Sequence, residues 1–433
     1  MTIELFKEYF EQLQQADHKS SLGTVRQNAF NAFSKMGIPG LKHEEWKYTR
    51  ISGVFNKEFK VPFVADVSIT KAEVDAVRLP GHEEANELVF VNGIFSFELS
   101  KIFSKDLTVL PLEEAAANEY KEIVSTHLGH SARYQKDGIN ALNTAFVHGG
   151  VFIHVSKGKI VEHPVYIYNI TDARFAPILS QPRSLIYVGV NAQMKLVETF
   201  STMGEQESFT NQVLEMVVEK DAHAEYYKIQ NDAGHSQVST THIRQIGKSY
   251  THTVTISLDG SIVRNNLNVI LDADHCESHL YGLYLMKGDT HVDNHTVVDN
   301  VQPNCFSNEL YKGIMDGNAT GVFNGKIFVE PDAQKTNAYQ SNKNILLSDS
   351  ASINAKPQLE IFADDVKCSH GCTVGSLDEE AMFYLRSRGI SEKTARSLML
   401  HAFADNVLEH INLPVIRDYV DELISERLGY EMV

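Results

Sequence analysis

The sequence predicts a mainly β protein: an N-terminal helical and mixed region (1–150), a β-solenoid core (151–372) and a C-terminal helical region (373–433). In the core, short β-rich runs follow one another, separated by Gly, Asn and Asp. Apolar residues alternate with Thr and Ser in Thr253–Leu258, and Phe323–Val329 has the same period of two, which is the period of a strand. No helical pattern longer than about two turns interrupts this region, which excludes alternating βαβ units.

Two architectures remain for the core, a large β-sandwich and a β-solenoid. The solenoid is favoured because the runs are short and because many turns carry Asn or Asp, as in the Asp-Gly pairs 259–260 and 316–317. Small polar residues and glycine tolerate the left-handed backbone of tight corners. The sequence therefore favours a solenoid whose corners are built by such residues.

Two amphipathic helices are predicted at the N-terminus. The apolar face of the first consists of Phe6, Tyr9, Phe10 and Leu13. The second is expected to end at Gly37 and Pro39. Its apolar stripe consists of Leu22, Val25, Ala29, Phe33 and Met36. Trp46, the only tryptophan, is expected to be a packing anchor. Further on, a strand over 87–91 and helical stretches over 112–128 are predicted.

Helices are also predicted after the core. Ser376 and Glu379 have the spacing of a capping box, and Gly389 ends the helix that they begin. Ser391 caps the next helix, and a third covers roughly 415–428. The apolar stripe of the second consists of Ala395, Leu398, Met399, Ala402, Phe403 and Ile411. Such helices can cap exposed strand edges of the solenoid, and the stripe is wide enough to cover the β body and also to dock a partner.

Composition narrows the classes of function. The net charge of −17 disfavours binding to nucleic acid and to anionic membranes. No apolar run is long enough to span a bilayer, and the N-terminus lacks a signal-peptide core, so a cytoplasmic location is expected. Four cysteines in 433 residues form no disulfide framework. Cys276 and Cys305 are interpreted as small buried apolar residues.

Standard catalytic motifs are absent from the sequence: it has no Walker loop, no GxGxxG, no GxSxG, no HExxH and no CxxC pair. Histidine is frequent, with 19 in the chain. His275 and His279 are four residues apart, as are His291 and His295, and on a strand each pair shares a face. Each pair is either a metal site or a polar ladder on the solenoid surface.

The run Lys367–Cys372, KCSHGC, lies where the core meets the helical tail. Cys368, His370 and Cys372 alternate, so an extended backbone places them on one face. Two thiols and an imidazole are soft ligands suited to iron, copper or zinc. Three ligands are an incomplete site unless a second subunit supplies more, and buried structural cysteines remain the alternative.

Two long blocks resemble the SufB/SufD family. They are DDVKCSHGCTVGSLDEEAMFYLRSRGISEKTARSLMLHAF, Asp364–Phe403, and TGVFNGKIFVEPDAQKTNAYQSNKNILLSDSASINAKPQLEIFADD, Thr320–Asp365. The resemblance extends back through YKGIMDG and THVDNHT to about residue 150, and HEEWKYTRI is similar to the family's SufD branch. The Cys-Ser-His-Gly order around His370 and the chain length also favour that branch over the SufB branch. Cys372 departs from the family, which commonly has alanine there.

The resemblance implies a right-handed parallel β-helix and a scaffold role, without catalysis, in iron–sulfur cluster assembly. It implies pairing with SufB through the β-helix, and binding of the ATPase SufC through the C-terminal helices. Cys368 and His370 would then receive iron or hold a nascent cluster at the interface with SufB, with no tightly bound cofactor. An exposed pairing edge also permits a homodimer when SufB is absent.

Two other functions compete with this interpretation. A β-helix carbohydrate-active enzyme needs carboxylates along one β face, for which Asp272, Asp274 and Glu277 are the candidates. A stand-alone metal-binding scaffold would use the histidine pairs described above. Each of these functions requires its residues to converge in the folded chain.

Overall fold

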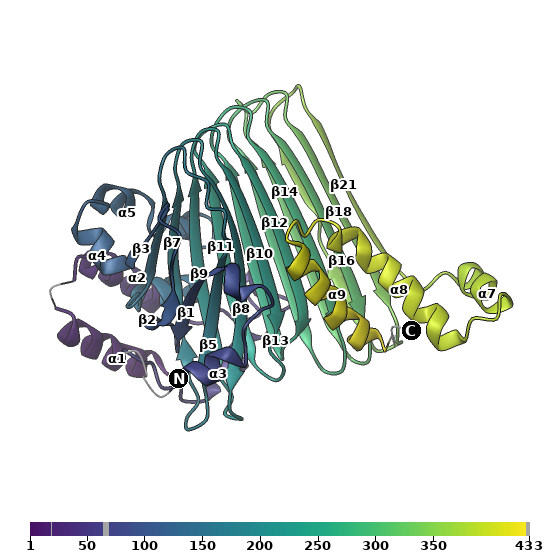
Figure 1. Ribbon diagram of the computed structural model, residues 1–433, viewed down its shortest axis with the longest axis horizontal. Helices are drawn as coiled ribbons and strands as arrows, with labels where there is room; N and C mark the ends of the chain where they lie inside the picture. Colours follow the sequence, from purple (N-terminus) through teal and green to yellow (C-terminus); the bar gives the residue numbers. More distant parts are fainter. Residues whose placement is uncertain (19, 64–68, 430–433) are drawn as a thin grey trace.

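The computed structural model describes residues 1–18, 20–63 and 69–429. Two large sheets face each other and form an elongated body, with helices at both ends of the chain (Figure 1). Within these residues, no helix is both long and apolar enough to cross a membrane.

The first sheet has ten strands in the order β2-β1-β5-β8-β10-β12-β14-β16-β18-β21. Every neighbouring pair is parallel except β1 and β2. Its strands are β1 (Asn86–Val91), β2 (Ile94–Lys101), β5 (Val165–Asp172), β8 (Gln193–Met203), β10 (His223–Asn231), β12 (Tyr250–Asp259), β14 (Glu277–Met286), β16 (Phe306–Met315), β18 (Asn337–Leu346) and β21 (Lys367–Gly375).

The second sheet has eleven strands, with β19-β17-β15-β13-β11-β9-β7-β4-β3 as its main path and with β20 and β6 paired to β17 and β9. Only β3 and β4 pair antiparallel. Its strands are β3 (Leu107–Pro111), β4 (Val151–Val155), β6 (Leu179–Ser180), β7 (Arg183–Val188), β9 (Phe209–Val218), β11 (Ser236–Gln245), β13 (Ile262–Leu271), β15 (His291–Asn300), β17 (Thr320–Val329), β19 (Ser352–Ala355) and β20 (Gln358–Ile361).

Successive strands from β8 to β18 alternate between the two sheets, so the chain winds as a β-solenoid with flanking helices, as predicted. Several of its corners have the same local conformation. A non-glycine residue with positive φ is followed by a small buried residue, as at Asp221–Ala222 (φ 57°) and Asn304–Cys305 (φ 59°). Cys276 occupies the same position, so the prediction of two small buried cysteines is confirmed.

Both faces of the ten-stranded sheet are buried along its middle. On β12, Val254, Ile256 and Leu258 belong to the cluster that lies under the C-terminal helices. The residues that alternate with them, Thr253, Thr255 and Ser257, therefore face the solenoid interior and are also buried. An apolar cluster fills the interior along the whole solenoid, with buried polar side chains such as Glu198 and Glu309 among it.

The N-terminal helices pack beside the first turns of the solenoid (Figure 1). They are α1 (Ile3–Ala16), α2 (Gly23–Met36), α3 (Lys71–Asp75), α4 (Leu112–Ala117), α5 (Lys121–His127) and α6 (Gly138–Ala145). The apolar face predicted for α1 is confirmed by buried Phe6, Phe10 and Leu13. The stripe predicted for α2 is partly wrong: Met36 is exposed, and Arg26 and Phe30 are buried instead.

Arg26 explains this shift in the α2 stripe. Its Nη1 lies 2.9 Å from the Asp17 carboxylate, its Nη2 lies 3.3 Å from Glu113, and its Nε donates to the Val147 carbonyl oxygen at 2.7 Å. A guanidinium can be buried where its donors are paired in this way. Apolar periodicity gives no weight to such a residue.

The sequence before residue 150 also contributes strands. β1 matches the strand predicted over 87–91 and joins the ten-stranded sheet beside β5, while β3 joins the eleven-stranded sheet. The helical stretch predicted over 112–128 forms two short helices, α4 and α5. The three-region division of the chain stays a prediction.

The C-terminal helices are α7 (Glu379–Ser387), α8 (Glu392–Leu408) and α9 (Pro414–Leu428). Ser391 caps α8 as predicted, since its Oγ accepts from the Thr394 amide at 3.1 Å. The capping box predicted at Ser376 is wrong: α7 is capped two residues later, by Asp378, which accepts from the amides of the first turn. Ala402 was expected in the buried stripe of α8 but is exposed.

Of the uses open to the C-terminal helices, α8 and α9 cover the β body and do not cap its end. Both helices lie along the outer face of the ten-stranded sheet, where Leu400, Val407 and Ile416 pack over the exterior of β12, β14 and β16 (Figure 1). That face is apolar and needs a cover, whereas helix α7 projects away from the body. The C-terminal end of the solenoid is therefore uncovered in the described chain. We call β19, β20 and β21 together the open end.

Candidate functional site

The run KCSHGC lies in β21, the last strand of the ten-stranded sheet and part of the open end. Strand β21 pairs with β18 on one side only, and the register places Cys368 beside Ala338, His370 beside Gln340 and Cys372 beside Asn342. Ala338 belongs to the interior core, and the Cys372 sulfur lies 3.6 Å from the Asn342 side-chain oxygen. Because side chains alternate along a strand, Cys368, His370 and Cys372 all point toward the solenoid axis. The structure thus brings the three predicted residues onto one face.

Their exposure suits a ligand that arrives from outside. Cys368 is half-buried against the interior core, whereas His370 and Cys372 are exposed. Burial raises the pKa of the Cys368 thiol, and a backbone hydrogen bond at Ala338 offsets only part of this effect. Burial also raises the pKa of Cys372. Both thiols are protonated at neutral pH, so a metal ion must displace a proton to bind either of them.

This proton release predicts a pH dependence. Below the thiol pKa, the apparent affinity of the isolated chain for Co²⁺ should rise by about tenfold per pH unit for each thiolate that binds the metal. Titrations between pH 6.5 and pH 8, followed by the thiolate-to-Co²⁺ charge-transfer band, measure the slope. The variant Cys368→Ser should flatten it. A pH-independent affinity in the wild-type chain would show that no thiol takes part.

The pair His291 and His295 is engaged in a different structure, the N-terminal anchor, which we define as Thr49, Arg264, Asp293 and the two histidines. His295 Nε2 lies 2.9 Å from Asp293, and His291 Nε2 lies 2.9 Å from the Thr49 hydroxyl, which also donates to Asp293. Arg264 Nη1 donates to Asp293 at 2.7 Å. The imidazoles therefore hold the N-terminal segment to the solenoid, and a metal-binding scaffold built on this pair is not favoured.

Trp46 is buried against the N-terminal anchor, which confirms its prediction as a packing residue. Its ring lies 3.9 Å under the Arg264 guanidinium, and its Nε1 donates to Asp137 at 3.0 Å. Burial raises the pKa of Asp293, but Arg264 and His295 outweigh that effect and hold it well below its usual range. The ion pair between Asp293 and Arg264 therefore contributes its full stability at neutral pH and loses it only in strong acid.

We expect Asp293→Ala to lower the free energy of unfolding by about 3–5 kcal/mol, because it leaves the Arg264 cation buried without a counter-charge. Chemical denaturation at pH 7 measures the loss. Asp349→Ala, in an exposed turn, is the matched control and should change stability by less than about 0.5 kcal/mol. Equal stability of the two variants would contradict the role given to the anchor.

The pair His275 and His279 does not share a strand face, so that interpretation is wrong. His275 lies in a corner with φ 59°, before β14 begins, and its Nδ1 pairs with Asp274 at 2.9 Å. His279 Nε2 pairs with Glu277 at 2.7 Å on the outer face of the ten-stranded sheet. Left-handed corners interrupt the alternation from which the shared face was predicted.

The candidate carboxylates of a carbohydrate-active enzyme are also dispersed. Asp272 accepts from Arg244 at 2.8 Å, and Asp274 accepts from Asn304 at 2.8 Å. With Glu277 paired to His279, each of the three carboxylates has a different partner around one corner. This arrangement does not favour glycoside chemistry.

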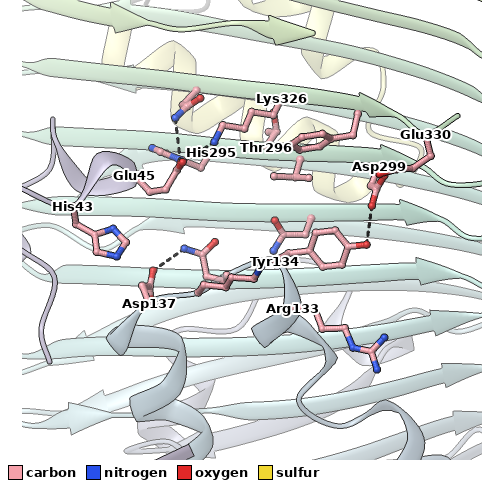
Figure 2. Close-up of a pocket in the computed structure, with 16 residues that line it drawn as sticks. His43, Glu45, Arg133, Tyr134, Asp137, His295, Thr296, Asp299, Lys326 and Glu330 are labelled. Carbon is pink, nitrogen blue, oxygen red and sulfur yellow. Dashed lines mark hydrogen bonds and ion pairs between the residues drawn. The ribbon is translucent and has the colours of Figure 1, made fainter. Parts of the chain in front are cut away.

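A groove of about 440 Å³ lies on the outer face of the eleven-stranded sheet, between this sheet and the segment 133–137 (Figure 2). Polar contacts cross it. Lys326 Nζ lies 2.6 Å from Glu45, and the Tyr134 hydroxyl donates to Asp299 at 2.8 Å. The groove contains none of the three residues at the open end. Its ion pairs connect the N-terminal region to the solenoid.

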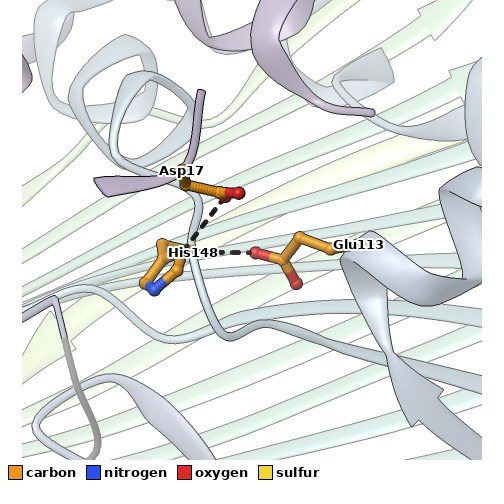
Figure 3. Close-up of side chains that lie close together, drawn as sticks. All are labelled: Asp17, Glu113 and His148. Carbon is orange, nitrogen blue, oxygen red and sulfur yellow. Dashed lines mark ion pairs between the residues drawn. The ribbon is translucent and has the colours of Figure 1, made fainter. Parts of the chain in front are cut away.

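Two clusters of histidine and carboxylate side chains have the geometry of a metal site. In each of them, ion pairs within the protein already use the carboxylates. Asp17, Glu113 and His148 converge beside α2 (Figure 3). The buried Arg26 guanidinium supplies the positive charge between the two carboxylates. In the second cluster, His401 bridges Asp405 and Asp421 at 3.3 and 2.8 Å and links α8 to α9.

Two residues next to the open end were not predicted from the sequence. Gln340 stands beside His370 in the register, and Glu309 stands beside Gln340 on the next strand. Both are buried in the solenoid interior, and Gln340 Nε2 donates to Glu309 at 2.8 Å. They can be identified only from the strand register, and the sequence does not show which strands pair or in which register.

Comparison with known families and proteins agrees with this architecture. Residues 169–403 match the family model described as "SUF system FeS cluster assembly, SufBD core domain", and residues 2–167 match the SufBD N-terminal region. A SufBD family protein of Synechocystis is 32% identical, with 94% of this chain and 91% of that protein covered. SufD of Escherichia coli is 28% identical over 91% and 90%, and SufD of Bacillus subtilis 26% over 72% of each. The chain therefore belongs to the SufBD family of iron–sulfur cluster assembly proteins.

Proposed function

We propose that this chain is a non-catalytic scaffold subunit that acts with SufB and the ATPase SufC in the cytoplasm. Its open end carries half of an iron or nascent-cluster site, formed by Cys368 and His370, and SufB supplies the remaining ligands. The observation that carries this proposal is the inward-facing Cys368 and His370 on a terminal strand with one unpaired edge. Iron or the cluster is the cargo of this site, which holds no tightly bound cofactor.

The open end supports pairing with a second solenoid. The unpaired edge of β21 and the short β19 and β20 present backbone donors and acceptors that another strand can satisfy. Ile361, Phe362 and Val374 add exposed apolar side chains there, at 39%, 59% and 47% exposure. Such an edge next to apolar surface marks a protein interface. In the absence of SufB, a second copy of the chain can occupy the same edge.

Co-purification with SufB and SufC tests this proposal. The wild-type chain should form a complex with both and carry iron and sulfide after anaerobic reconstitution. Cys372→Pro should prevent SufB pairing, because proline removes a donor on the unpaired edge: Lys367 donates its amide to Thr336, just before β18, and alternation along the strand then turns the Cys372 amide away from β18. The control is Ser348→Pro, in the corner after β18. A complex unaffected by changes along β21 would place the interface elsewhere.

A further inference from the structure

A column of three side chains leads from the open end into the solenoid. His370, Gln340 and Glu309 occupy matching register positions on β21, β18 and β16. Neighbouring strands are about 4.8 Å apart, so side chains at matching positions on one face are in contact distance of each other. His370 is exposed, Gln340 is 3% exposed and Glu309 is 1% exposed.

The inner half of this column has a defined hydrogen bond. Gln340 Nε2 donates to Glu309 Oε2 at 2.8 Å. The side chain of Gln340 reaches across the interior to Gly325 on β17, in the opposite sheet. A Cβ atom at Gly325 would come within 2.3 Å of Gln340 Nε2. Glycine at this position therefore makes room for Gln340. Burial raises the pKa of Glu309 to about 7, and hydrogen bonding lowers it only in part.

The outer half of the column has an acceptor without a donor. Because the amide nitrogen of Gln340 faces the carboxyl group, its carbonyl oxygen Oε1 faces away from Glu309. Oε1 is buried and has no hydrogen-bond partner among the described residues. A buried acceptor left unpaired costs about 1–3 kcal/mol in general, so a donor is expected beside it. His370 is the residue in the next register position.

We propose that Gln340 and Glu309 position His370 for ligand binding. One imidazole N–H donates to Gln340 Oε1, Gln340 Nε2 donates to Glu309, and the second ring nitrogen presents its lone pair at the open end. Metal-bound histidines are oriented in this way by an acceptor on the other ring nitrogen, which fixes the tautomer. The purpose of this arrangement rests on the proposed function, but the arrangement itself is a property of the isolated chain.

The histidine tautomer in the metal-free chain tests the proposal. Selective ¹⁵N-histidine labelling reports the tautomer of each imidazole by NMR, and His370→Ala identifies the His370 signals. One tautomer should predominate in the wild-type chain. In Gln340→Leu the ratio should move by about threefold or more toward that of free imidazole, because a hydrogen bond is lost. Glu309→Leu should move it in the same direction.

The matched control is Gln237→Leu, which removes a buried glutamine on β11, in the middle of the other sheet and away from the open end. It should leave the His370 tautomer unchanged, although both variants lose stability. Where Glu309→Leu does not fold, Gln340→Leu alone decides. An unchanged tautomer in folded Gln340→Leu would overturn the proposal and would assign the Oε1 partner to an internal water. The experiment uses the isolated chain without iron or SufB. A negative result would therefore contradict this hydrogen-bond arrangement and not the proposed function.

Discussion

Replacing Phe383 with alanine is expected to weaken SufC binding by about 30-fold or more, the loss typical of an aromatic hot spot of at least about 2 kcal/mol. Phe383 lies on α7, which projects from the body, and is 74% exposed, with Tyr384 beside it at 57%. Two adjacent exposed aromatic residues on a projecting helix mark a protein contact. Calorimetry with purified SufC measures the change.

Phe175→Ala is the matched control for this prediction. Phe175 is 85% exposed and lies in the connection between β5 and β6, so its loss should leave SufC binding unchanged. Truncation of the whole tail is a poorer test, because α8 and α9 cover Val254, Ile256 and Leu258. Their removal would expose apolar surface and destabilise the fold. Full affinity of Phe383→Ala would move the SufC contact away from α7.

Replacing His370 with alanine is expected to lower cluster formation in the complex with SufB and SufC by about tenfold or more. Loss of a residue that merely orients a ligand already costs 10- to 100-fold in metal affinity, so loss of a ligand should cost no less. The His370 side chain is exposed at an uncovered edge, so its loss should leave the fold intact and the complex should still assemble. Iron and sulfide per complex after reconstitution measure the effect.

His279→Ala controls for the general loss of an imidazole. His279 lies on the outer face of the ten-stranded sheet and pairs with Glu277. This variant should give a wild-type cluster yield and, together with His370→Ala, separates the open end from the other histidines. A wild-type yield in His370→Ala, with the complex intact, would remove His370 from the site.

The alternation in Thr253–Leu258 predicted a strand but not which face lies inside. Val254 and its apolar neighbours face outward, under α8 and α9, while Thr253 and Thr255 face the interior. Period two identifies residues that share a face, and a sheet buried on both faces needs knowledge of its cover to decide between them. For the same reason, the sequence could not decide whether the C-terminal helices cap the end of the solenoid or cover its side.

The candidate site was predictable where it depended on local spacing. Alternation alone places Cys368 and His370 on one face of β21. Their relation to Gln340 and Glu309 depends on strand register between segments about thirty residues apart, which no local pattern determines. The shared face predicted for His275 and His279 failed because a left-handed corner precedes β14, whereas His291 and His295 share a face and the buried charge of Asp293 decides their partners.

Hydrogen exchange along β21 tests most directly whether the site at the open end is completed by SufB. In the isolated chain, amides on the unpaired side of β21 should exchange quickly, because they have no strand partner. In the complex with SufB, those amides should become protected, while β2 at the opposite edge of the same sheet should exchange as before. Protection at β2 with no change along β21 would contradict the account.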